Sequence, residues 1–201
     1  DIVGYTGNGS ARTIAHSLSA VPKMIIIKNR DTIKAWQVGH ESIGWGNGIY
    51  LNENSASQSD NGAFNSTDPT TSVFSIETSS YVNTSSDNYI AYLWAEKQGF
   101  SKFGGYTGNG NADGTFIYTG FRPSLVIWKK TSASGAWPMY DIKRDPINPM
   151  TKRIQASDGD TEADQSAAKI DFLSNGIKLR TTDSEWNGSG VTYVFMAFAE
   201  A

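Results

Sequence analysis

One six-residue motif occurs twice in this chain, and that repetition constrains the fold more than any other feature. Gly-Tyr-Thr-Gly-Asn-Gly stands at Gly4–Gly9 and again at Gly105–Gly110, 101 residues later. Other identical residues recur at the same spacing of 101, and near the end of each copy the spacing becomes 104. They include Pro22 and Pro123, Trp36 and Trp137, Asn83 and Asn187, and Tyr89 and Tyr193. A repeat of half the chain predicts two tandem domains, 1–100 and 101–201.

The distribution of turn-forming and apolar residues predicts strands rather than helices. Glycine, serine, threonine and asparagine are abundant, and no segment keeps an apolar stripe of helical period over three turns. Short apolar runs alternate with turn signals roughly every 8–12 residues, as in β-sandwiches and barrels. We therefore predict an all-β chain made of two tandem β-sandwich repeats, jelly-roll-like, of about 100 residues each.

Two strands of each copy are expected to lie in the middle of a sheet. The unbroken run Met24–Ile27 follows Pro22, a residue tolerated at the start of a strand, and predicts burial on both faces. The most apolar strand closes each copy, at 89–96 and 193–200, which indicates a central place. Trp36 and its counterpart in the second copy are predicted to be core residues, because large aromatic side chains dominate the buried area of β domains.

Composition and charge exclude several classes of protein. The formal charge is −3 and the isoelectric point about 5.4, whereas nucleic-acid-binding domains usually carry a basic patch, so we expect no nucleic-acid partner. A chain without cysteine has no disulfide and no thiolate metal site. No apolar run approaches the roughly 20 residues of a membrane span, which argues against membrane insertion. The first residue is not methionine, so we expect either a piece of a longer chain or a processed product.

No catalytic motif is present, and we predict a protein that is not an enzyme and has no cofactor. The two histidines, His16 and His40, do not form the clusters that metal sites and acyl-transfer triads need. The glycine-rich motif has neither the spacing nor the following helix of a phosphate-binding loop. A glycosidase needs only two carboxylates about 5–10 Å apart. A glycosidase or a secreted carbohydrate-binding module is therefore kept as an alternative.

An acidic segment of the second copy is a candidate calcium site. Alternating carboxylates on a loop can converge on Ca²⁺, which takes six to eight oxygen ligands. The segment has Ala163 where an EF-hand loop needs glycine and Lys169 where it needs glutamate, so the alternative is a solvated acidic loop. The candidate ligands are Asp158, Asp160, Glu162 and Asp164.

Aromatic residues in loops are the candidate binding residues. An exposed ring beside asparagine side chains can stack on a sugar while the amides bond its hydroxyl groups. The alternative is that the rings close the ends of the sandwiches or the seam between the copies. The candidate ligand-binding residues are Trp45, Asn47, Tyr50, Trp186 and Asn187. The loops expected to carry recognition are Gly44–Gly48, Asn52–Thr71, Lys143–Lys169 and Ser184–Gly190.

Several segments together resemble a known family over nearly the whole chain. They are the two Gly-Tyr-Thr-Gly-Asn-Gly motifs, 22–28, Trp36, 90–96, 99–103, 120–123 and 170–176. The chain is similar to a tandem β domain of unknown function found in tail-fibre-like virion proteins of marine bacteriophages.

That resemblance implies a phage virion structural protein on the virion surface, outside cells. It implies a tail-fibre or adhesin module for host-surface attachment, with a host-surface glycan as a candidate ligand. It also implies a homo-oligomer, with a trimer favoured, in contact with other virion proteins. The alternative is a purely structural capsid-decoration or neck-fibre module.

Overall fold

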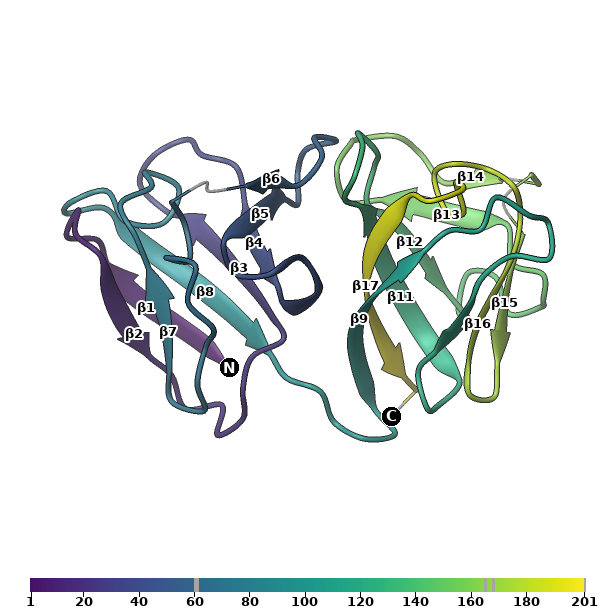
Figure 1. Cartoon of the computed structure of the whole chain (residues 1–201), viewed down its shortest axis with the longest axis horizontal. Helices are drawn as coiled ribbons and strands as arrows, with labels where there is room; N and C mark the ends of the chain where they lie inside the picture. The colour runs from purple at the N-terminus through teal and green to yellow at the C-terminus, as the bar shows by residue number, and fades with distance from the viewer. Residues whose placement is uncertain (60–61, 165, 168, 201) are drawn as a thin grey trace. The chain divides into compact units, whose positions relative to one another are not determined.

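The computed structural model describes residues 1–59, 62–164, 166–167 and 169–200, and it consists mainly of β-strands and loops (Figure 1). The all-β prediction is confirmed. The one helical element among these residues is the 3₁₀ turn Glu41–Ile43, so none of them belongs to a helix long and apolar enough to cross a membrane. The chain divides into two compact units, Asp1–Ala95 and Glu96–Ala201.

The first unit is a sandwich of two antiparallel sheets. Across its large sheet the strands are β1 (Ile2–Thr6), β8 (Asn88–Trp94), β3 (Met24–Asn29), β4 (Gln37–His40), β5 (Asn47–Tyr50) and β6 (Gln58–Ser59). Its small sheet pairs β2 (Arg12–Ala15) with β7 (Val73–Ile76). The core combines residues of both sheets, among them Ile25, Ala91, Ile14 and Phe74.

The second unit has the same strand order and one additional strand. Its large sheet runs β14 (Ala163–Asp164), β13 (Lys152–Gln155), β12 (Pro138–Asp141), β11 (Pro123–Lys130), β17 (Thr192–Ala199) and β9 (Ser101–Thr107). Its small sheet runs β10 (Phe116–Tyr118), β16 (Gly176–Arg180) and β15 (Lys169–Leu173). Here β9 and β17 take the places of β1 and β8, and β15 is the additional strand. The core includes Trp128, Tyr140, Phe172 and Trp186.

The strands expected in the middle of the first large sheet are central. β3 lies between β8 and β4, and all of its residues except the half-buried Lys28 are buried. β8 lies between β1 and β3 and alternates buried with half-buried positions after the exposed Asn88. Trp137 is buried as predicted, whereas Trp36 is only half-buried and stacks on Tyr92 with ring centroids 6.4 Å apart.

Residues 96–100 belong to the second unit, although the repeat placed the division after residue 100. Glu96 forms an ion pair with Lys102 of β9, at 2.9 Å. The carbonyl of Phe100 accepts a hydrogen bond from the amide of Ala199, at 2.8 Å. These contacts attach the segment to the edge of the second sheet, next to β9.

Candidate functional site

One buried asparagine, Asn187, holds the second copy of the repeated motif in place through hydrogen bonds. Asn187 has no exposed surface. Its Oδ1 accepts the amide of Asn109 at 3.0 Å, and its Nδ2 donates to the carbonyl oxygens of Asn111 and Thr181, both at 2.8 Å. The carbonyl of Asn187 also accepts the amide of Gly110. The turn after β9 is therefore held to the loop before β17 by side-chain and backbone hydrogen bonds.

The first unit contains the same arrangement around Asn83. This side chain is also fully buried; its Oδ1 accepts the amide of Asn8 at 2.9 Å, and its Nδ2 donates to the carbonyls of Ser10 and Glu77, both at 2.7 Å. The carbonyl of Asn83 accepts the amide of Gly9. The motif thus performs the same structural task in both units.

A pair of stacked tyrosines supports each of these turns. In the second unit the rings of Tyr106 and Tyr193 lie 4.7 Å apart and nearly parallel. The Tyr106 hydroxyl donates to the carbonyl of Trp186, and that of Tyr193 donates to the carbonyl of Ser184. Burial raises the pKa of Tyr193 to about 12, and it raises the pKa of Tyr106 well above its usual value. These phenols are neutral hydrogen-bond donors in the fold.

Glycine is required in the motif because the opposing loop lies against it. A Cβ atom at Gly108 would overlap the carbonyl oxygen of Gly188, and one at Gly7 would overlap that of Thr84. Backbone atoms cannot move aside as a flexible side chain can. The repeated motif is therefore a structural lock between the turn and the opposing loop.

The expectation that Trp45 is a stacking platform is wrong. The indole is 5% exposed and packs edge-on against Phe64, with ring centroids 5.4 Å apart. Gly39 of β4 makes room for it, because a Cβ there would collide with both rings. Tyr50 is 4% exposed, and the side chain of Asn47 donates to the carbonyl of Ile43. The alternative, that these residues close the end of the sandwich, agrees with their positions.

The expectation that Trp186 and Asn187 bind ligand is wrong for the same reason. Trp186 is 1% exposed and belongs to the core of the second unit. Asn187 uses its amide in the lock described above. A loop that contributes to a core presents the same glycines and asparagines as a recognition loop, so the sequence could not separate the two roles.

The four acidic residues do not form a metal site in the described part of the chain. No group of three or more histidine, aspartate or glutamate side chains gathers there closely enough to hold a metal ion. Glu162 instead pairs with Arg144 at 3.1 Å, and Asp164 ends the short edge strand β14. Of the expected recognition loops, residues 60, 61, 165 and 168 lie outside the described residues.

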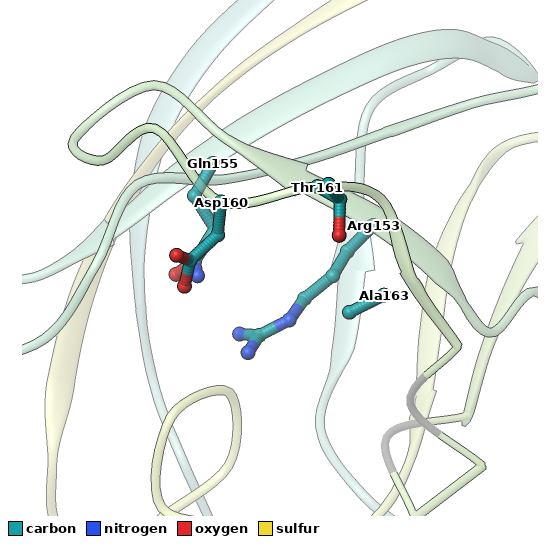
Figure 2. A pocket seen from close by; sticks show the side chains of 5 residues that line it. All are labelled: Arg153, Gln155, Asp160, Thr161 and Ala163. Carbon is teal, nitrogen blue, oxygen red and sulfur yellow. The ribbon is translucent and has the colours of Figure 1, made fainter.

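A polar pocket in the second unit is the first candidate site that the structure adds. It has a volume of about 260 Å³ and lies where β13 faces β14 and the segment before it. Figure 2 shows the side chains of Gln155, Asp160 and Arg153, which come from β13 and from the segment before β14. We call this cavity the Arg153 pocket; it is lined by Arg153, Gln155, Asp160, Thr161 and Ala163.

Arg153 is the unusual member of this pocket. Its guanidinium lies over the ring of Trp186, with Cζ 5.2 Å from the centroid, a distance typical of a cation–π contact. Its Nε is buried and has no hydrogen-bond partner among the described residues. The other half-buried arginines of the described chain, Arg12 and Arg144, both donate hydrogen bonds.

An exposed aromatic surface on the small sheet of the second unit is the other candidate. Phe116 and Tyr118 of β10 are 43% and 64% exposed, while Ile117 between them is buried. Directly paired residues share a face of a sheet, and Phe116 pairs with Lys178 of β16. Arg180, two residues farther along β16, shares that outer face. We call Phe116, Tyr118, Lys178 and Arg180 the aromatic face.

Ion pairs hold the charged side of this face in place. Lys178 pairs with Asp113 at 2.7 Å, and Arg180 pairs with Asp171 of β15 at 2.7 Å. The side-chain hydrogen bond from Lys178 lowers the pKa of the Asp113 carboxyl below its usual value. The face therefore presents two aromatic rings beside ordered charged groups. The aromatic–aliphatic–aromatic order of Phe116–Tyr118 places both rings on one face of a strand, but it does not indicate whether that face is exposed.

Comparison with known proteins identifies the family of the chain without assigning a function. Residues 1–201 match the family described as Domain of unknown function (DUF7483), and the chain belongs to that family. No curated protein matches the chain. No solved structure matches it either.

Proposed function

We propose that this chain is a surface module of a phage virion, of the tail-fibre or adhesin type, which attaches to a glycan on the host surface. The proposal begins with the resemblance to tail-fibre-like virion proteins. The observation that carries the binding role is the aromatic face, where Phe116 and Tyr118 are both exposed on the outer side of β10.

The composition of this face suits a sugar better than an apolar partner. A pyranose ring has weakly polar C–H faces and hydroxyl groups at its rim, so it needs a flat ring below it and hydrogen-bonding groups beside it. Tyr118 adds a phenol hydroxyl, and Lys178 and Arg180 supply N–H donors. An apolar protein surface would leave these charged groups without water, at a cost in binding free energy.

The scaffold is suited to presenting such a face without changing shape. The small sheet is packed on a core whose members include Ile117, Ile170 and Leu179. The Asn187 lock fixes the loop before β17. A face on paired strands loses little conformational freedom when it binds, which favours affinity. Repetition in a homo-oligomer, with a trimer favoured, would add avidity for a host surface that presents many copies of one glycan.

A glycan array compared across two variants tests the proposal. The test variant is Phe116→Ala/Tyr118→Ala. The matched control is Ile33→Ala/Ile147→Ala, which removes two exposed apolar side chains from other places, 102% and 75% exposed. Burial of roughly 50 Å² of each ring at about 25 cal/mol per Å² contributes about 1.2 kcal/mol per ring. The test variant should therefore bind about 50-fold more weakly, and the control should bind like the original chain.

The result also separates this function from its alternative. If the original chain, shown by sedimentation to be in its native oligomeric state, binds no glycan on the array, attachment through the aromatic face is refuted. A purely structural role, as a capsid-decoration or neck-fibre module, would then be the better proposal. Equal loss of binding in both variants would place the glycan site elsewhere.

A further inference from the structure

We propose that the Arg153 pocket binds the carboxylate group of an acidic sugar of monosaccharide size. This site uses residues other than those of the aromatic face, so it is independent of the function proposed above. The argument rests on a guanidinium that has no acceptor, on the groups that surround it, and on the corresponding position of the first unit.

The first step is that Arg153 lacks an acceptor in the described structure. It makes no hydrogen bond and no ion pair with another described residue, and its buried Nε has no partner. Asp160 lines the same pocket, but the two charges do not form an ion pair within 4.0 Å. A partly buried guanidinium without an acceptor costs free energy, and an incoming oxyanion would remove that cost.

The second step is that the guanidinium is held in position before a ligand arrives. The buried Trp186 ring contacts the guanidinium and limits its movement on that side. β13 holds the backbone of Arg153 against Ala163 of β14. A guanidinium presents parallel N–H donors whose spacing matches the two oxygens of a carboxylate. A fork that is already ordered loses less entropy on binding.

The third step is that the neighbours of Arg153 select the rest of the ligand. Gln155 offers an amide, Thr161 a hydroxyl and Asp160 a carboxylate, and none of these side-chain groups makes a hydrogen bond or ion pair with another described residue. Together they can donate to and accept from several hydroxyl groups. The negative charge of Asp160 disfavours a doubly charged phosphate more than a singly charged carboxylate.

Size points to the same class of ligand. The pocket volume of about 260 Å³ lies below the roughly 300–1,000 Å³ of pockets for drug-sized ligands. It suits a single sugar ring rather than a nucleotide. A ligand with one carboxylate and several hydroxyl groups uses all four polar side chains of the pocket. A hexuronic acid has this composition.

The first unit shows what this position looks like without the site. Ile154 of β13 pairs with β12, and Ile49 of β5 pairs with β4 in the same way, so these two residues occupy equivalent positions. The residue before Ile154 is Arg153, and the residue before Ile49 is Gly48. Glycine thus replaces arginine there. The end of that sandwich is filled by Trp45 instead. The first unit is therefore an internal reference that should not bind the acid.

NMR titration of the 201-residue chain tests the proposal. The probes are D-galacturonate, its methyl ester, D-galactose and inorganic phosphate. Galacturonate should shift the amide signals of residues 153–163 and leave those of 47–59 unchanged. Removing the carboxylate charge, in the ester or in galactose, should weaken binding about 10- to 100-fold, as expected for loss of hydrogen bonds to a charged group.

Variants assign the effect to the guanidinium. Arg153→Met should lose galacturonate binding by a similar factor. Arg153→Lys keeps the positive charge without the fork and should also bind at least about fivefold more weakly. The matched control is Arg122→Met, at an exposed arginine of the same unit, and it should bind like the original chain. If Arg153→Met fails to fold, the lysine variant and the location of the amide shifts still show whether the Arg153 guanidinium binds galacturonate.

Three results would overturn the proposal. The first is the absence of galacturonate-dependent shifts at residues 153–163. The second is equal affinity for galactose and galacturonate, because the carboxylate would then contribute nothing. The third is phosphate binding as tight as galacturonate binding, which would indicate a general anion site. None of these results bears on glycan binding by the aromatic face, which has its own variants.

Discussion

Replacing Asn187 with alanine is expected to lower the free energy of unfolding of the second unit by about 3–5 kcal/mol. The substitution removes one amide side chain that has no exposed surface. It leaves the carbonyl oxygens of Thr181 and Asn111 and the amide of Asn109 without their partner. The lock between the turn after β9 and the loop before β17 then depends on its backbone hydrogen bonds.

The magnitude follows from the burial of each bond. The bond to the Thr181 carbonyl is fully buried, and an unpaired buried acceptor costs about 1–3 kcal/mol. The bonds with Asn109 and Asn111 are part-buried, and each contributes about 1 kcal/mol. For a unit of about 100 residues, 1 kcal/mol shifts the thermal midpoint by roughly 4–8 °C. The midpoint of the second unit should therefore fall by more than about 10 °C.

Asn187→Asp gives a second test with a different signature. It keeps an acceptor for the Asn109 amide but places an oxygen where Nδ2 faced carbonyl oxygens. A buried carboxyl in this place has a raised pKa, so its neutral form fits the fold better than its charged form. Stability should therefore be highest below the pKa of an unfolded aspartate, about 3.9, and should be lost as the pH rises through the raised folded value.

Urea unfolding followed by hydrogen exchange and mass spectrometry can assign the loss to a unit. Peptides from 96–201 should lose protection in Asn187→Ala, while those from 1–95 keep theirs. The reciprocal variant, Asn83→Ala, should show the opposite pattern because it removes the corresponding lock. A destabilisation below about 0.5 kcal/mol in Asn187→Ala, the level of an ordinary surface substitution, would refute the assignment of the motif as a lock.

Three further predictions concern the glycines, the buried indole and the tyrosines. Gly108→Ala should destabilise the second unit by more than about 2 kcal/mol, because its Cβ would overlap the carbonyl oxygen of Gly188. Gly159→Ala, with no atom near its Cβ, should be neutral. Equal urea midpoints for the two variants would contradict this reasoning. Trp45→Ala should cost about 3–5 kcal/mol in thermal unfolding, since the ring is buried, and an unchanged midpoint would show that the ring lies outside the core. Burial raises the pKa of Tyr193 to about 12 from 10.0. The unfolded chain therefore loses this proton first, and stability should fall as the pH rises from 10.0 towards about 12. A free energy of unfolding, measured in urea, that stays constant over this pH range would count against this.

The sequence by itself determined the class of the fold and the place of its central strands. Turn residues recur at short intervals, and apolar runs such as Met24–Ile27 are too short for helices and too apolar for an exposed edge. These are local properties, since strand period and turn chemistry act over a few neighbouring residues. The repeat, through identities at a spacing of 104 residues, also marked Asn83 and Asn187 as equivalent positions. Both occupy the same kind of lock.

Only the tertiary structure decided which residues are available to a ligand. The glycine-flanked Trp45 could have been exposed, and its burial depends on the space above Gly39 of β4. Phe116 and Tyr118 could have faced the core, and their exposure follows from the pairing of β10 with β16. The free guanidinium of Arg153 depends on which side chains β14 and the segment before it bring to β13. Burial and pairing of this kind come from residues distant in sequence, so no local pattern encodes them.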